Sequence, residues 1–198
     1  MKHAVIVAHP NASSFNLAMA HAYQAAAEAL GHRVMLRDLY RMGFDPRLGE
    51  AEVPKPGGFH PADDVLAERA TIGGADVFVF VYPLWFNSPP AMMKGYLERV
   101  FGMGFGYGEA ESAQPLLSGR RMVSISSSGA PKAWMVETGA WDAVSRLFDQ
   151  HFSTVCGLSL VEHLHQGQIT PGITAEAVEG CKERVAELVR THFGPAQD

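Results

Sequence analysis

The stretch that decides the fold runs from Val77 to Ala91 and reads VFVFVYPLWFNSPPA. Its first six residues, Val77–Tyr82, are all apolar or aromatic, which is typical of a strand covered on both faces in a parallel sheet. A proline-stiffened turn with two large aromatic side chains follows, and a helical pattern then extends over Pro90–Phe101. The stretch therefore predicts one strand–turn–helix unit of an α/β fold.

The same alternation of strand and helix runs through the whole chain. The predicted strands are His3–Ala8, Arg33–Leu39, Val77–Tyr82, Arg121–Ser126 and Leu158–Leu164, and the predicted helices are Asn16–Leu30, Pro61–Ile72, Pro90–Phe101, Trp141–Val155 and Thr174–His192. Such alternation predicts a doubly wound α/β sheet. Five strands rather than six favour the flavodoxin-like three-layer sandwich, with a five-stranded parallel sheet in the order 2-1-3-4-5 and helices on both faces.

Length and composition indicate a single domain spanning residues 1–198, with 47% hydrophobic and 19% charged residues. A net charge of −5 and the absence of any Lys/Arg run argue against nucleic-acid binding. The first apolar run is too short for a signal segment or a membrane span, so we expect a cytoplasmic protein without membrane insertion. Cys156 and Cys181 have no metal-binding or redox spacing, and we expect two reduced, buried thiols rather than a disulfide.

The first candidate binding turn follows the first strand and contains His9, Ser13 and Ser14. It carries neither a GxGxxG nor a Walker-type motif. Hydroxyl groups, the free N–H groups of a helix start and the positive end of the helix dipole nevertheless converge there, and all of them favour a phosphate. The alternative is that Ser14 is simply an N-cap and His9 a turn residue.

Two further turns should lie at the same edge, because parallel strands end there and ligands bind near the topological switch. The turn after the third strand offers Trp85 and Phe86 to a flat ring, and its backbone N–H groups to ring heteroatoms. The alternative is an apolar plug against the neighbouring helix. The turn Ser126–Pro131 is rich in hydroxyl groups, and its alternative is a serine-rich turn without a ligand.

Together these motifs resemble the NAD(P)H:quinone oxidoreductase family, which includes DT-diaphorase and the ancillary oxidoreductases of potassium-efflux systems. The resemblance covers about residues 1–190 of the chain. It rests on His9, Ser14-Phe15-Asn16, Tyr82-Pro83-Leu84-Trp85-Phe86, Pro90-Ala91, Lys94-Gly95 and Glu98-Arg99-Val100-Phe101.

The resemblance assigns a role to each turn. It implies that the first turn holds the phosphate of a flavin, that the second contacts the isoalloxazine ring and that the third holds the pyrimidine edge of that ring. The residues concerned are His9, Ser14, Phe15 and Asn16; then Pro83, Leu84, Trp85 and Phe86; then Ser126, Ser127, Ser128 and Gly129.

Departures from the family pattern concern the third turn and the residues after it. Ser128 replaces a glycine, and this position would be strained if its φ were positive. Trp134 stands where the family commonly has a tyrosine, and no histidine lies between Gly129 and His151. The family's proton relay therefore does not transfer to this chain. We expect Trp134, and Phe105 from the Gly/aromatic loop Phe101–Tyr107, to contact the substrate.

The resemblance implies a flavin-dependent NAD(P)H oxidoreductase that transfers hydride through the flavin to quinones or related two-electron acceptors in a ping-pong cycle. No side chain is expected to act as an essential acid or base, and no metal is expected, so His163 and His165 are interpreted as strand residues that share a face. FAD is favoured by the resemblance, with FMN as the alternative, and a homodimer is expected. Other hypotheses are a regulatory flavoprotein subunit of a potassium-efflux system and a one-electron carrier.

Overall fold

A computed structural model of the chain describes residues 1–55, 58–108 and 114–195. Its central sheet has the strand order β2-β1-β3-β4-β5, and every neighbouring pair is parallel. The strands are β1 (Lys2–Val7), β2 (Arg33–Asp38), β3 (Val77–Pro83), β4 (Arg121–Ser127) and β5 (Ser159–Gln166). The predicted flavodoxin-like order 2-1-3-4-5 is therefore confirmed.

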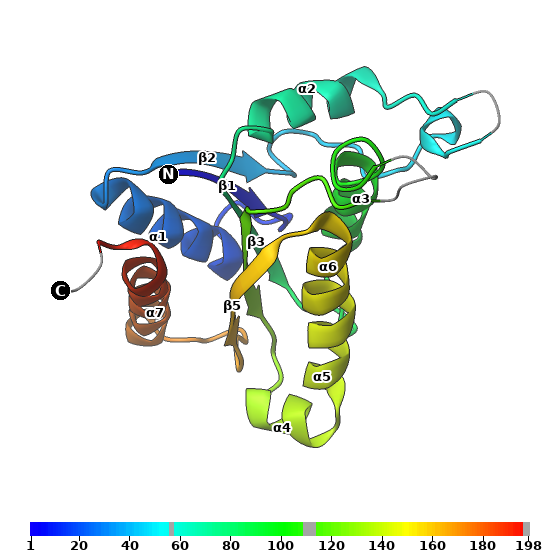
Figure 1. The fold of residues 1–198 in the computed structure, drawn as a ribbon. Helices are drawn as coiled ribbons and strands as arrows, with labels where there is room; N and C mark the ends of the chain where they lie inside the picture. Colours follow the sequence, from blue (N-terminus) through cyan, green and yellow to red (C-terminus); the bar gives the residue numbers. More distant parts are fainter. Residues whose placement is uncertain (56–57, 109–113, 196–198) are drawn as a thin grey trace.

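Helices cover both faces of this sheet (Figure 1). Helices α1 (Phe15–Ala29) and α7 (Ala175–Phe193) pack side by side on one face. The other face is covered by α2 (Asp63–Ile72), α3 (Ala91–Val100) and a long helical segment made of α5 (Ala140–Val144), η2 (Ser145–Phe152) and α6 (Ser153–Cys156). Residues of β3 alternate between the two faces, so that Val79 and Val81 face α1 while Phe78 and Phe80 face α3.

The two cysteines lie in these two separate cores. Cys156 is buried in the core under α3, and Cys181 is buried in the core under α1 and α7. Both thiols are free and buried.

The predicted helix over Trp141–Val155 differs most from the structure. A short helix, α4 (Lys132–Glu137), precedes it, and Gly139 separates the two with a φ of 75°. Residues Ser145–Phe152 are π-helical, with wider turns than an α-helix. Phe148 and Asp149 are consecutive and both buried there. The loop 43–61 joins β2 to α2, and its described residues include one short 3-10 turn, η1 (Glu50–Glu52).

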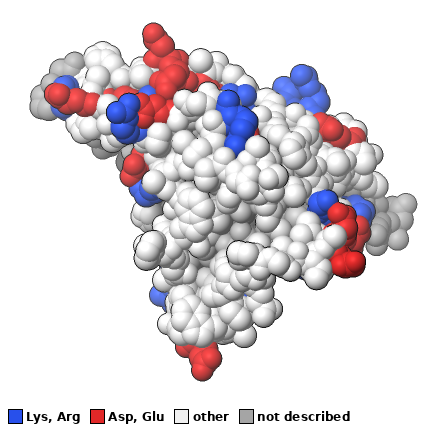
Figure 2. All heavy atoms as spheres, turned by 180° about the vertical axis from the view of Figure 1, so that it is seen from behind, with Lys and Arg blue, Asp and Glu red and all other residues white. Residues whose placement is uncertain are grey.

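No helix in the described part of the chain combines the length and the apolar character needed to cross a membrane. On the face shown in Figure 2, Lys, Arg, Asp and Glu side chains gather at the margins and leave a broad uncharged area between them. Several large apolar side chains are exposed, among them Trp85, Phe86 and Trp134. These three belong to the predicted site.

Candidate functional site

The turns after β1, β3 and β4 leave the sheet side by side at its carboxyl edge. The backbone N–H of Ala8 donates to the carbonyl of Val81 at 3.1 Å, and the N–H of Leu84 donates to the carbonyl of Ser127 at 2.7 Å. These bonds continue the sheet for one residue beyond its strands. The three turns that the sequence analysis singled out therefore share one edge.

Side chains also connect the first turn to the other two. The Asn16 amide donates to the Ser127 hydroxyl at 3.0 Å, and both groups are buried. The His9 ring lies 5.7 Å from the Trp85 ring, centroid to centroid. Asn16, Ser127, His9 and Trp85 are thus brought together as the sequence predicted.

The first turn is preorganised for an anion. Ser14 is the N-cap of α1, and its hydroxyl oxygen accepts from the N–H of Leu17 at 3.2 Å. Its hydroxyl hydrogen stays available, as do the N–H groups of Phe15 and Asn16, because the first turn of a helix has no internal acceptor for them. Ser14 is therefore an N-cap, as the alternative interpretation of this turn predicted. The same geometry also points donors at the ligand position.

Arg41 is a charged residue at this turn that sequence reasoning missed. It follows β2, and its guanidinium donates to the carbonyls of His9 and Pro10, at 2.8 Å for Pro10. Its Nε donates to Asp38 at 2.9 Å. Burial lowers the pKa of His9 below its usual 6.5, and the charge of Arg41 lowers it further. His9 is therefore neutral at pH 7, and a bound phosphate would act in the opposite direction.

The second turn is a tight two-residue hairpin with a strained backbone. Trp85 and Ser88 exchange N–H···O bonds of 2.9 and 3.1 Å, and Phe86 and Asn87 between them have φ of 49° and 56°. A phenylalanine rarely adopts this left-handed conformation. Its ring is fully exposed. The Asn87 amide donates to the carbonyl of Ala140 at 2.8 Å, which fixes the hairpin to the start of α5. Such strain is typical of functional turns.

The third turn divides its serines between the two faces of the sheet. Ser127 points toward α1 and Asn16, whereas the Ser126 hydroxyl contacts His163 and His165 on the opposite face. The Ser126 side chain therefore faces away from Asn16, because successive strand residues alternate. Ser128 has no positive φ, so the expected strain is absent. Gly129 is exposed.

The two predicted substrate residues lie in different places. Trp134 is half-exposed on α4, next to Met135, whose sulfur receives a 3.5 Å contact from the Ser128 hydroxyl. Trp134 is therefore close to the third turn. Phe105 instead packs against Phe78, near the start of β3, because α3 runs back toward the amino ends of the strands. Within one chain, Phe105 does not reach the carboxyl edge.

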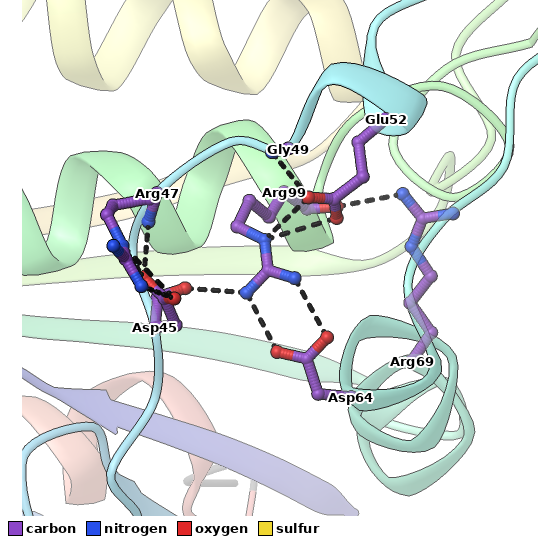
Figure 3. Close-up of polar contacts among 7 residues, drawn as sticks. All are labelled: Asp45, Arg47, Gly49, Glu52, Asp64, Arg69 and Arg99. Carbon is purple, nitrogen blue, oxygen red and sulfur yellow. Dashed lines mark hydrogen bonds and ion pairs between the residues drawn. The ribbon is translucent and has the colours of Figure 1, made fainter.

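A cluster of charged residues holds the loop 43–61 against α3 (Figure 3). Arg99 donates to Glu52 at 3.0 Å, to both carboxylate oxygens of Asp64 at 2.8 Å and to the carbonyl of Asp45 at 2.6 Å. These hydrogen bonds hold the pKa of Asp64 below its usual range. The loop presses on α3 so closely that a side chain at Gly95 would lie 2.1 Å from the carbonyl oxygen of Pro46. This contact explains a glycine inside a helix.

Between this loop, α3 and η2 lies an apolar groove of about 400 Å³, and the residues of the loop Phe101–Tyr107 that line it include Met103 and Tyr107. None of the predicted flavin-contacting residues lines this groove. It is separate from the carboxyl edge.

The donor set at the carboxyl edge fits a flavin. A phosphate tail matches the helix start with its hydroxyl and cationic groups, and a planar ring with polar heteroatoms matches exposed aromatic side chains beside backbone N–H groups. The residues that would hold the phosphate are His9, Ser14, Phe15, Asn16 and Arg41, and those nearest the ring are Leu84, Trp85, Phe86, Ser127 and Ser128.

Comparison with known proteins supports this fit. Residues 1–189 match the flavodoxin-like fold family, and the chain belongs to it. It is 33% identical to an uncharacterized NAD(P)H oxidoreductase of Haemophilus influenzae, over 82% of this chain and 81% of that protein. It is 28% identical to NAD(P)H dehydrogenase [quinone] 1 of Cavia porcellus, over 93% of this chain and 76% of that one.

Solved structures agree with the sequence relatives. The NAD(P)H:quinone oxidoreductase from Methanothermobacter marburgensis superposes with a TM-score of 0.84 at 25% identity, over 100% of this chain and 99% of that one. The FMN-dependent NADH-azoreductase from Bacillus anthracis, at 17% identity, shares the fold, with a TM-score of 0.74 over 98% and 100% of the two chains. The resemblance to the NAD(P)H:quinone oxidoreductase family is therefore confirmed.

Proposed function

We propose that the protein is a flavin-dependent NAD(P)H oxidoreductase that reduces quinones or related two-electron acceptors. The observation that carries this proposal is the meeting of three turns at one edge, tied together by the Asn16–Ser127 and Leu84–Ser127 hydrogen bonds. A bound flavin supplies the hydride chemistry, which no side chain can perform. The chain's own residues bind and orient the flavin and its substrates, and they exclude water.

Each part of the edge has a proposed task. Ser14 and the N–H groups of Phe15 and Asn16 hold the phosphate, and the charge of Arg41 adds to the helix dipole. Trp85 and Phe86 border the ring and leave a flat space where first the nicotinamide and then the acceptor can lie. The N–H of Gly129 and the Ser127 hydroxyl are aimed at the polar edge of the ring. Donors placed there in advance stabilise negative charge without reorganisation.

We further propose that two copies of the chain complete the site. Phe105 lies far from the carboxyl edge of its own chain, yet the loop Phe101–Tyr107 contributes to an apolar groove. Exposed apolar surfaces of this kind commonly mark partner contacts. A second copy covering this groove would let Phe105 approach the acceptor of its neighbour, as the family's interfacial flavin sites imply. We place the reaction in the cytoplasm, in a single domain over residues 1–198.

The flavin itself is FAD or FMN, and releasing it from the protein by heating allows the two to be distinguished. FAD is the form that the resemblance to DT-diaphorase favours, whereas the azoreductase named above is described as FMN-dependent. Chromatography of the flavin released from the purified protein identifies the form. Release of FMN alone would overturn the preference for FAD and leave the proposed reaction intact.

The test of the proposal is NAD(P)H oxidation by the yellow, purified protein with a simple benzoquinone as acceptor. The Asn16→Ala variant removes the link between the first and third turns. We expect its flavin dissociation constant to rise about fivefold, since one buried hydrogen bond contributes about 1 kcal/mol. Gln24→Ala, at an exposed position of the same helix, is the matched control. A protein that binds no flavin, or holds flavin without oxidising NAD(P)H, contradicts the proposal.

The alternative role in potassium efflux gains no support from the relatives reported above. It predicts negligible turnover with quinones together with binding to an efflux channel. A one-electron carrier predicts a stable semiquinone in a reductive titration.

A further inference from the structure

A continuous line of hydrogen-bonded side chains runs inward from the third turn. The Ser128 hydroxyl contacts His165 Nε2 at 3.0 Å, and His165 Nδ1 contacts the Ser126 hydroxyl at 2.8 Å. The same hydroxyl contacts His163 Nε2 at 2.6 Å, and His163 Nδ1 contacts the Asp149 carboxylate at 2.6 Å. Five side chains from β4, the third turn, β5 and η2 thus form one continuous path, which is called the Ser128–Asp149 path below.

The path is sealed at its inner end and approaches solvent at its outer end. The Asp149 side chain is fully buried and the His163 side chain is 5% exposed. Ser128 lies at the carboxyl edge, directly before the exposed Gly129. A proton on His163 is therefore connected to the proposed flavin site through Ser126, His165 and Ser128, in that order.

Hydrogen-bond accounting gives a first arrangement in which His163 is charged. The Ser128 hydroxyl donates to the carbonyl of Ala130 at 2.8 Å, so its oxygen accepts from His165 Nε2–H. A neutral His165 then accepts from the Ser126 hydroxyl at Nδ1, and the Ser126 oxygen accepts from His163 Nε2–H. His163 also donates from Nδ1 to Asp149. Both nitrogens of His163 carry protons, because a ring that donates from both is an imidazolium.

The same contacts allow a second arrangement in which the hydrogen bonds between Ser128 and His163 Nε2 are reversed. The Ser128 hydroxyl turns from Ala130 and donates to His165 Nε2. His165 Nδ1–H donates to Ser126, and the Ser126 hydroxyl donates to His163 Nε2. His163 is now neutral and still donates from Nδ1 to Asp149. The two arrangements differ by one proton on the path and by the direction of its hydrogen bonds.

We infer that the Ser128–Asp149 path is a proton wire that stores one proton on His163 beside Asp149 and releases it at Ser128 when the acceptor is reduced. The inference rests on the proposed function. A quinone becomes a hydroquinone by gaining one hydride and one proton: NAD(P)H supplies the hydride and the wire supplies the proton. His163 changes from imidazolium to neutral imidazole, Asp149 stays a carboxylate, and solvent later returns the proton through Ser128.

The groups around His163 favour this division of charge. The Asp149 carboxylate from η2 stabilises a proton on His163. Burial, together with the charges of His163 and Lys132, lowers the pKa of His165 from 6.5 to about 4, so His165 stays neutral and passes protons on. From β3, burial holds the pKa of Tyr82 well above its usual value, and its hydroxyl stays protonated.

Two serines of β4 provide a matched pair of variants. Ser124 and Ser126 are both fully buried on the same face, and each hydrogen-bonds to the path. Ser126→Ala cuts the path between the two histidines. Ser124→Ala removes a hydrogen bond to Asp149 and leaves the path continuous. A loss of activity that is specific to the proton path must therefore appear in Ser126→Ala and be absent from Ser124→Ala.

The primary readout is nitrogen NMR of the histidine rings, measured without NAD(P)H or acceptor. We expect His163 to carry protons on both nitrogens near pH 7 in the wild type and in Ser124→Ala, and to lose one of them at a lower pH in Ser126→Ala than in either. A wild-type His163 with a single ring proton over about pH 5 to 9 overturns the inference. So does a Ser126→Ala protein whose His163 titrates as in the wild type.

The second readout is quinone reduction as a function of pH. General acid catalysis contributes about 10²-fold or more, and we expect kcat for Ser126→Ala to fall by at least about tenfold above pH 7, with an unchanged KM for NAD(P)H and unchanged flavin affinity. Ser124→Ala should lose less than about twofold in kcat. Equal losses in the two variants overturn the wire. A protein without oxidoreductase activity contradicts the proposed function, while the NMR measurement still reports on the path.

Discussion

Arg99→Met is expected to destabilise the folded protein by about 3–5 kcal/mol, because it leaves a buried carboxylate without its cationic partner. The side chains of Arg99 and Glu52 are 5% and 6% exposed, and Nε of Arg99 donates to both oxygens of Glu52 at 3.0 and 3.1 Å. Methionine fills much of the same volume. The lost charge, rather than a cavity, should therefore dominate the effect.

The structure allows the contributions to be separated. Without Arg99, the Glu52 carboxylate retains the N–H of Gly49 as a donor at 2.8 Å. Asp64 is half-exposed, so water replaces its lost partner and its share is about 1 kcal/mol or less. The carbonyl of Asp45 loses a donor, which costs about 1 kcal/mol. Most of the expected loss thus belongs to Glu52.

Urea unfolding, followed by circular dichroism at fixed protein concentration and without added flavin, measures the difference. Asp64→Asn is the control and should cost about 1 kcal/mol or less. The double variant Glu52→Met/Arg99→Met should recover about 2 kcal/mol or more of the loss, since neither buried charge remains. If Arg99→Met proves no more destabilising than Asp64→Asn, the reasoning from buried charge is refuted.

Three further predictions concern the site and its surroundings. Phe86→Gly should raise stability by about 1 kcal/mol in thermal or urea unfolding, because the exposed ring loses no packing and glycine accepts the left-handed backbone; Phe86→Ala, which keeps the strain, should bring no such gain. Folding stability should decline as the pH falls from about 6.5 to 4, since burial lowers the pKa of His3 and His165 to about 4 and the unfolded chain binds these protons first; constant stability over this range contradicts the assignment. Flavin should bind more tightly at pH 6 than at pH 8 in fluorescence titrations, because a bound phosphate raises the lowered pKa of His9, and His9→Asn should abolish the difference.

The sequence was sufficient for the fold because its central strands β1 and β3 are nearly continuous apolar runs. Val77–Tyr82 has no polar residue, and only a position buried on both faces accommodates such a run. Similarly, Gly31 follows the first helix with a φ of 77°, and Thr174 caps the last helix through its side chain. Local chemistry fixes these features, so they can be read without knowing distant contacts.

The candidate site was predictable at the level of turns and less so at the level of side chains. Ser14, Asn16, Trp85 and Ser127 meet as expected. Arg41 was missed because it follows the edge of β2, and its contact with His9 and Pro10 depends on the pairing of β1 with β2. Ser126 and Ser127 stand side by side in the sequence, yet their hydroxyl groups lie on opposite faces of the sheet. One residue of strand decides which face a side chain occupies.

The Ser128–Asp149 path shows why polar partners on separate elements escape sequence reasoning. Phe148 and Asp149 are consecutive residues of the helical segment that follows α5. The π-helical segment widens the turn, and both side chains are buried, Phe148 against Phe80 and Asp149 against His163. A short wider turn has no pattern that single-sequence periodicity detects. The π-helical segment thus packs Phe148 into the aromatic core and also places the Asp149 carboxylate behind the third turn. Asp149 meets His163 there only because the register of β4 and β5 brings His163 opposite Ser124.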